Sequence, residues 1–260
     1  METESSARYA CPCCGCRTFA APPSGSYIVC PVCVWEDLPP LDLVREGISL
    51  HRAQRSFLAT GAADPRYRDA ARAPEPHEQR PAGWQSIDET IETLTGEIAA
   101  AFADVTREDG VTLHEADVLD GYGSDEQRAA ARRLDTDRHW SEVEQTAIER
   151  HPSAANFLDA KGFRYYLPAY MSWALRNYDT TDSAAIGSLL STLSTRWEKD
   201  SRPGVAPIPD PERCPLLTDA QAQTVCRFLR FFAAYSDSGL DVEHAQQALR
   251  QHWAQFCEAN

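Results

Sequence analysis

The sequence lacks any run of about eighteen apolar residues, the length that a membrane-spanning helix needs. Its opening residues, Met1–Ser6, are mostly polar or acidic, and no apolar stretch of the kind found in secretory signals follows them. We therefore expect no membrane span, no secretory signal and a cytoplasmic location.

The motifs of common catalytic folds are also missing. The sequence has no G-x-S-x-G nucleophile elbow, no P-loop and no G-x-G-x-x-G dinucleotide motif. Cys214, Cys226 and Cys257 are scattered and have no local signature of a nucleophile. Cys226 lies in an apolar stretch and is expected to be a buried small hydrophobe. We assign no catalytic residue, and the sequence disfavours an enzyme.

Positive charge is scarce, with a formal net charge of −14 and only two lysines. Residues 1–80 contain 10 acidic and 9 basic residues, a net −1, whereas residues 81–260 contain 29 and 16, a net −13. A surface of that sign repels nucleic-acid phosphates and attracts basic proteins. The second part is therefore expected to bind a basic partner, although excess acidic residues also serve solubility alone.

Cysteine is abundant, with nine in all and six of them between residues 11 and 33. An odd, clustered set in a chain without an export signal favours metal ligands and free thiols over a disulfide framework. Two C-P-x-C knuckles, at 11–14 and 30–33, together read C-x2-C-x15-C-x2-C. This spacing is typical of a four-thiolate zinc site.

The predicted ligands hold one structural zinc ion per chain and are Cys11, Cys14, Cys30 and Cys33. Cys13 and Cys16 form a rival C-x2-C pair, but only the first frame places Pro after its first cysteine and Gly after its second. Four thiolates leave no open coordination position, so hydrolysis at the metal is not expected.

The residues around the knuckles predict a zinc ribbon over 8–61. Strands at Arg17–Phe19 and Tyr27–Val29 are expected to pair across a turn, and Ser49 to begin a helix that ends at Gly61. The inner side of that helix is predicted to carry Leu50, Ala53, Phe57 and Leu58. A core this small needs its metal, which supplies about 10–16 kcal/mol in comparable peptides. Residues 62–83, rich in Arg and Pro, are expected to form an extended strap or linker.

Residues 84–260 predict an all-α domain, so the fold class is mainly α behind a small ribbon of β-hairpins and one short helix. Capping-box pairs, a hydroxyl followed three residues later by Glu or Gln, begin at Ser86, Thr112, Ser124, Ser141 and Thr218. Apolar residues recur at intervals of three and four over 87–102, 225–232 and 242–256. The proline-rich segment 201–217 is expected to be a loop.

Two groups of residues in this domain are candidates for contacting a partner. The first is an acidic run with histidines nearby, which could also hold a divalent cation: Asp117, Asp120, Asp135 and Asp137. Helix caps and solvated loops account for such residues equally well. The second lies in the segment 159–171, where a tyrosine-lined cleft with polar contacts is one interpretation and a buried aromatic stripe the other: Asp159, Arg164, Tyr165 and Tyr166.

Two resemblances to known families follow from these motifs. Tyr9–Gly15, Cys30–Asp37 and the helix after Ser49 resemble the bacterial cysteine-rich CPCC domain over roughly residues 8–80, which implies zinc binding and no settled activity. Cys16 departs from the aromatic residue expected there. Phe157–Met171 and Thr112–Ala116 are similar to an uncharacterised bacterial domain of unknown function over about residues 90–235.

We therefore expect a non-catalytic zinc-binding protein that binds another protein, as the immunity partner of a bacterial toxin does. Two alternatives stay open. One is a metal-dependent enzyme built on the Asp/His cluster, and the other is a nucleic-acid-binding ribbon assisted by the Arg-rich strap. Acidic residues balance the arginines of that strap, which makes nucleic acid the less favoured partner.

Overall fold

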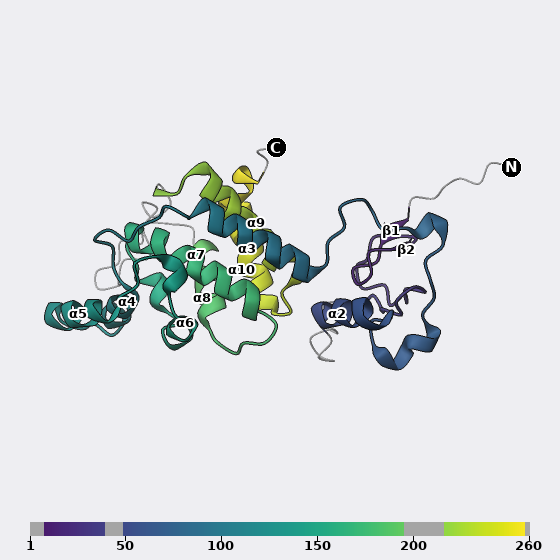
Figure 1. The fold of residues 1–260 in the computed structure, drawn as a ribbon, viewed down its shortest axis with the longest axis horizontal. Coiled ribbons are helices and arrows are strands. Elements are labelled where there is room, and N and C mark those ends of the chain that lie inside the picture. The colour runs from purple at the N-terminus through teal and green to yellow at the C-terminus, as the bar shows by residue number, and fades with distance from the viewer. Residues whose placement is uncertain (1–7, 40–48, 195–215, 258–260) are drawn as a thin grey trace. The chain divides into compact units, whose positions relative to one another are not determined.

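The structure, a computed structural model, describes residues 8–39, 49–194 and 216–257. Contacts within the chain divide it into two units, Met1–Thr90 with Asp237–Gly239, and Ile91–Ser236 with Leu240–Asn260. The first unit contains two short strands and the cysteine knuckles, and the second is helical (Figure 1). The predicted fold class is confirmed. Among the described helices, none has both the length and the hydropathy of a membrane span.

Each knuckle folds back on itself. β1 (Tyr9–Ala10) pairs antiparallel with β2 (Arg17–Phe19), and Val29 forms an isolated bridge with Glu36. The prediction that the strand at 17–19 pairs with residues 27–29 is therefore wrong. The reason is local, because a tight C-x2-C turn returns the chain at once. Its two flanks meet at a lower entropic cost than two segments from different knuckles.

α2 (Leu50–Thr60) supplies part of the core around the cysteines. Three of its predicted inner residues pack there: Leu50, Ala53 and Phe57. Leu58 is 52% exposed, so its predicted inward position is wrong. Gln54 is buried in its place, where its amide donates to Pro12 O at 2.8 Å and accepts the Ile87 N–H at 2.7 Å.

The strap at 62–83 contains two 3-10 turns, η1 (Pro65–Ala70) and η2 (Pro76–Glu78). Glu78 is buried and accepts both terminal nitrogens of Arg72, at 2.7 and 2.8 Å. The same carboxylate accepts the N–H of Glu75 at 2.9 Å. Polar contacts therefore help to organise this segment, whose apolar residues apart from Tyr67 are all alanines and prolines.

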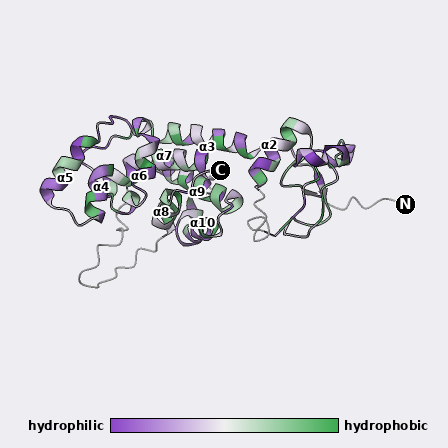
Figure 2. Ribbon diagram, turned by 90° about the horizontal axis from the view of Figure 1, so that it is seen from below, coloured by the Kyte–Doolittle hydropathy of each residue, from purple (hydrophilic) through white to green (hydrophobic). Residues whose placement is uncertain are grey.

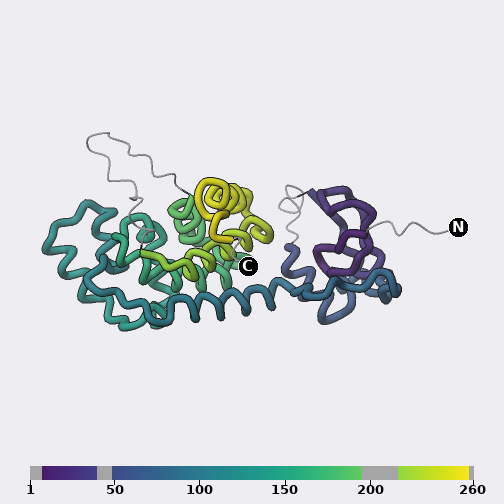
Figure 3. The backbone as a smooth tube through the Cα atoms, turned by 90° about the horizontal axis from the view of Figure 1, so that it is seen from above, coloured from purple at the N-terminus to yellow at the C-terminus, as the bar shows by residue number. Residues whose placement is uncertain are grey.

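The remaining helices build the second unit around α7, and Figure 3 traces the chain through them. They are α3 (Ile87–Ala101), α4 (Leu113–Asp120), α5 (Asp125–Ala131), α6 (Gln145–Arg150), α7 (Ala160–Asn177), α8 (Ala185–Ser194), α9 (Asp219–Tyr235) and α10 (Gly239–Gln251). Short 3-10 turns join or follow them: η3 (Arg132–Leu134), η4 (Trp140–Glu142), η5 (Ala154–Asn156) and η7 (Trp253–Phe256). Thirteen of the eighteen residues of α7 are buried, which makes it the central helix of this core.

The sequence signals for these helices are largely confirmed. The capping pairs that begin at Ser86, Thr112, Ser124 and Thr218 are all present. The pair predicted at Ser141 is wrong, because this serine lies inside η4 and α6 begins only after Glu144. The ring of His139 accepts the Ser141 N–H instead.

The predicted apolar faces form the core of the second unit. Val225, Phe228, Leu229 and Phe232 are fully buried in α9, and Leu94, Ile98 and Phe102 are buried along α3 and just after it. The face predicted over 242–256 is divided, because α10 ends at Gln251 and Trp253 is buried from η7. Both hydrophilic and hydrophobic residues occur along each of these helices, as amphipathic helices require (Figure 2). The loop predicted over 201–217 lies outside the described residues as far as 215.

Candidate metal centre

Four thiols from the two knuckles meet in the first unit. The Sγ atoms of Cys11, Cys14, Cys30 and Cys33 lie within 4.8 Å of one another, and all four side chains are buried. The Sγ–Sγ distance is 3.7 Å both for Cys11–Cys33 and for Cys14–Cys30. The structure thus brings together the four residues that the sequence predicts as ligands. Across the described part of the chain, no other group of three or more His, Cys, Asp or Glu side chains is placed to hold an ion.

The two knuckles share one backbone pattern. In the first, the Gly15 N–H donates to Cys11 O, and in the second the Val34 N–H donates to Cys30 O, both at 2.8 Å. In each knuckle the N–H of the first cysteine also donates to the carbonyl five residues ahead. The residue after the second cysteine is left-handed in both, with φ of 73° at Gly15 and 62° at Val34. Each turn therefore presents two thiols on the same side.

Proximity and burial set the charge state of these thiols. Hydrogen bonds from the other three cysteines hold the pKa of Cys30 well below its usual range, and the Thr18 hydroxyl lies 3.3 Å from its sulfur. Hydrogen bonds with Cys11 and Cys30 raise the pKa of Cys14. Four adjacent thiolates would repel one another in a buried space, so a divalent cation is what would allow all four to ionise. The donor set fits a thiophilic metal.

The end of the strap covers the first knuckle. The Arg80 Nε donates to Cys14 O at 2.7 Å, and its guanidinium stacks on the Trp84 ring, 4.4 Å from the centroid. A Cβ on Gly15 would lie 2.5 Å from the indole nitrogen of Trp84. Glycine is thus required at this position both for its backbone angle and for the close approach of the ring.

The rival pair of cysteines takes no part in the four-thiol group. Cys13 and Cys16 are buried beside it, and they belong to the core that also contains Phe19 and Trp35. Buried thiols in such surroundings act as small hydrophobes, and their burial keeps them from reagents in solvent.

Two of the acidic residues proposed for partner contact pair with histidines. Asp135 Oδ1 lies 2.8 Å from His114 Nδ1, and Asp117 Oδ1 lies 3.2 Å from His151 Nδ1. The two imidazole rings meet edge to face with centroids 4.6 Å apart. Asp120 is exposed on α4. The Asp135 carboxylate orients the His114 ring through a hydrogen bond, and the described residues add no third ligand atom within reach of a common ion.

Arg107 gathers three more of the proposed residues. It donates to Asp137 and to the Tyr166 hydroxyl, both at 3.0 Å, and its guanidinium lies 5.6 Å from the centre of the Tyr165 ring. Both tyrosines are fully buried, and burial raises the pKa of each phenol. Their rings belong to the core, so they line no cleft and cannot contact a partner.

Asp159 and Arg164 fasten a loop to the start of α7. Asp159 Oδ1 accepts the N–H groups of Gly162 and Val111, each at 2.8 Å. A Cβ on Gly162 would lie 2.3 Å from Val111 O, so this glycine allows the loop to approach the helix. Arg164 donates to Glu108 at 3.3 Å. The conspicuous motif at 157–171 is therefore used in packing.

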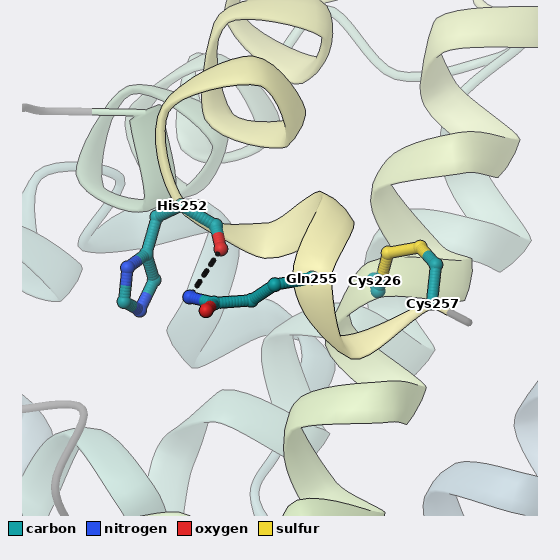
Figure 4. Close-up of a disulfide and its surroundings, with 4 residues drawn as sticks. All are labelled: Cys226, His252, Gln255 and Cys257. Atoms are coloured by element: carbon teal, nitrogen blue, oxygen red, sulfur yellow. Dashed lines mark hydrogen bonds between the residues drawn. A yellow bond between two sulfur atoms is a disulfide. The ribbon is translucent and has the colours of Figure 1, made fainter. Parts of the chain in front are cut away.

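A disulfide that the sequence did not predict joins Cys226 of α9 to Cys257 after η7 (Figure 4). Cys226 is buried as expected, but the expectation of a free thiol there is wrong. The Cα atoms are 5.6 Å apart, within the usual range for a disulfide. Thirty-one residues separate the two cysteines, and neither has a motif, so only the packing of η7 on α9 shows the pairing.

Two family models match the chain. Residues 90–257 match the one described as "Family of unknown function (DUF6714)", and residues 9–78 match the one described as "Cysteine-rich CPCC". Both resemblances drawn from the sequence are confirmed, and the second extends past residue 235 to residue 257. Comparison with curated proteins and with solved structures finds no match.

Proposed function

Because the chain belongs to the family of unknown function DUF6714, we propose its function from its own residues: it is a non-catalytic zinc-binding protein that binds a basic protein. In its finer form the proposal is that the partner is a bacterial toxin and that the chain is its immunity protein. It also places the chain in the cytoplasm, where the Cys226–Cys257 disulfide would be an exception to the usual reduced state of thiols. The cysteine module contributes a rigid, metal-stabilised unit, and the acidic helical unit contributes the binding surface.

The sulfur geometry carries the zinc part of the proposal. A tetrahedral ion with metal–sulfur bonds of about 2.3 Å has sulfur–sulfur edges of about 3.8 Å. Two of the six sulfur–sulfur pairs lie at 3.7 Å, and all six lie within 4.8 Å. A closed, buried set of four thiolates suits a structural zinc ion, which has no need of an open position.

Metal analysis of the purified chain tests this part. We expect one zinc per chain, lost in Cys30→Ser and retained in Cys13→Ser, which removes a neighbouring buried thiol outside the set. Iron in place of zinc would contradict the assignment, since iron also accepts tetrahedral thiolates. A second equivalent of metal would revive the alternative of a metal enzyme.

Charge and the use of polar residues support the binding part. Residues 81–260 have a formal charge of −13. Asp137 of the Asp/His cluster pairs with Arg107, which weakens the alternative of a metal enzyme. In the strap, Arg66 pairs with Asp64 and Arg72 with Glu78, which weakens the case for nucleic acid.

Capture followed by kinetics tests the binding part. The full chain should retain a basic protein from a lysate of the organism that encodes it, and the purified pair should associate more slowly as salt rises. Association that salt leaves unchanged would contradict the role of charge. A captured protein that kills cells only when this chain is absent would support the immunity role, and a harmless one would refute it.

A further inference from the structure

One short hairpin of the second unit carries the two most exposed large apolar side chains among the described residues. Tyr122 is 85% exposed and Leu134 is 63% exposed. They flank α5, a helix whose one buried residue is Ala131. α5 lies beside α4 (Figures 1 and 2). Tyr122 precedes α5 and Leu134 ends the 3-10 turn after it, so an interface over both side chains would cover the outer side of the helix along its whole length.

Polar contacts hold α5 in place and leave its outer side uncovered. The buried carboxylate of Glu115 accepts Arg128 at 3.0 Å and Arg132 at 2.8 Å. A capping box between Ser124 and Gln127 fixes the start of the helix. Exposed residues recur at intervals of four along the solvent side: Glu126, Ala130 and Leu134. The helix is thus ordered through ion pairs, while Ala130 and the Leu134 that follows the helix stay exposed.

The turn before α5 presents its tyrosine in a fixed conformation. Tyr122 has a left-handed backbone with φ of 55°, and its N–H donates to Leu119 O at 3.1 Å. Gly123 packs against Val118, where a Cβ would lie 2.3 Å from the valine methyl. A side chain on an ordered turn loses less entropy on binding than one on a mobile loop.

The hairpin is also acidic. Asp120, Asp125 and Glu126 are exposed, with the Asp125 side chain at 93%. Arg133 is exposed, and Arg128 and Arg132, each about one-third exposed, share the carboxylate of Glu115, so residues 115–134 contain five acidic and three basic side chains, a net −2. An aromatic side chain therefore projects from a surface of negative sign. That combination is complementary to a basic protein surface with a recess for one ring.

We propose that the α4–α5 hairpin, residues 117–134, is the surface through which this chain binds a basic protein; this rests on the proposed function. Tyr122 is the central anchor, Leu134 is the second apolar contact, and the acidic residues pair with Lys and Arg at the rim. Phosphate backbones and anionic membranes carry the wrong sign for this surface.

Dissociation constants for the captured, purified partner test the surface on the full-length chain. Tyr122→Asn removes the ring and keeps a residue that tolerates the left-handed turn. We expect it to weaken binding about 30-fold, and Leu134→Ala about fivefold. Leu240→Ala is the matched control, since that leucine is 59% exposed on α10, and it should change affinity less than about twofold. Unchanged unfolding temperatures establish that the variants stay folded.

The experiment distinguishes an error in the proposed binding surface from an error in the proposed function. If no basic protein is captured, both proposals are overturned. If a partner is captured and binds Tyr122→Asn and Leu134→Ala as tightly as the wild type, the surface alone is overturned. Replacing Asp120, Asp125 and Glu126 with lysine should slow association about tenfold or more at low salt. An unchanged association rate would also reject the hairpin.

Discussion

Two residues at equivalent positions of the knuckles show how sequence and backbone agree in one turn and conflict in the other. Gly15 and Val34 both follow the second cysteine of a knuckle and both have positive φ. Glycine adopts this conformation freely, whereas a β-branched residue is strained there by about 1–2 kcal/mol. The strain therefore falls on the second knuckle, although the two motifs look alike in the sequence.

Val34→Gly should tighten zinc binding, because zinc affinity in a module of this kind contains its folding free energy. Relief of strain exceeds the entropy that glycine costs by about 0.5–1 kcal/mol, which corresponds to a two- to fivefold gain in affinity. Competition with a chromophoric chelator measures the change. Gly15→Ala is the control with the opposite expected effect. Its Cβ would collide with Trp84, so its zinc affinity should fall about tenfold or more. Weaker zinc binding by Val34→Gly would contradict the argument.

At the residue scale the sequence predicted which four cysteines come together, because the spacing of a C-x2-C pair is a local property. It left open whether Tyr165 and Tyr166 line a cleft or join the core. Aromatic residues at helical spacing show which side chains share one face of the helix. The spacing does not show whether that face packs in the core or is exposed to solvent. α7 is buried on nearly every side, so both tyrosines are interior.

At the scale of elements, the conformation of the strap depends on the buried carboxylate of Glu78, which accepts hydrogen bonds from Arg72 and from the Glu75 N–H. Hydrogen bonds from Arg72 lower the pKa of Glu78 from an ordinary 4.5 to about 2. A carboxyl with a lowered folded-state pKa stabilises the fold fully above its unfolded pKa and loses that effect as the pH falls toward the folded value. The contribution is therefore complete above about pH 5 and lost progressively between pH 5 and pH 2.

Glu78→Gln should lower the unfolding temperature of the cysteine module at neutral pH, and the gap from the wild type should close as the pH falls from 5 to 2. Acid also releases zinc from the wild type and from the variant alike. The difference between their unfolding temperatures therefore reports the contribution of the Glu78 carboxylate. Thermal unfolding at a series of pH values measures it. Glu75→Gln, an exposed neighbour in the same strap, should show a much smaller gap. A gap for Glu78→Gln that stays constant with pH would show that the ion pair contributes nothing.

The C-terminal turn is the second element that depends on a single linkage. Removing the Cys226–Cys257 bond frees a loop of 31 residues, which costs about 3–4 kcal/mol by chain entropy. Cys257→Ser should lower the unfolding temperature of the helical unit accordingly, and reductant should then have no further effect on that unit. Thiol titration of the denatured wild type should find at most seven of the nine cysteines free. Nine free thiols, or an unchanged unfolding temperature, would refute the linkage.

Helices were predicted better than pairings at this scale. Caps and apolar periodicity lie within one segment, and four of the five capping pairs form as the sequence indicates. Strand pairing in the knuckles and the disulfide depend on which segments meet in space. Periodicity carries no information on that, so residues 27–29 received the wrong partner and Cys226 was taken for a free thiol.

For the whole molecule, two separate cores underlie the two parts of the charge distribution. The first core is built from cysteines with Phe19, Val32 and Trp35, and we expect it to depend on bound metal. The second is built from aromatic and aliphatic side chains of α7, α8 and α9. Its acidic surface therefore rests on the packing of these side chains, which gives a binding surface the stable shape that it requires.

Metal removal should accordingly unfold one unit and spare the other. With a strong chelator, the amides of the knuckles, such as Val34 N–H and Gly15 N–H, should lose their protection from hydrogen exchange, because the four thiols repel one another once the ion has gone. Amides of α9 beside Phe228 and Phe232 should keep theirs, since burial of those rings involves no metal ligand. Exchange followed by mass spectrometry resolves the two regions, and Cys11→Ser without chelator should reproduce the same pattern. Loss of protection in α9 together with the knuckles would show that the units fold as one, and the ion would then stabilise the acidic surface as well.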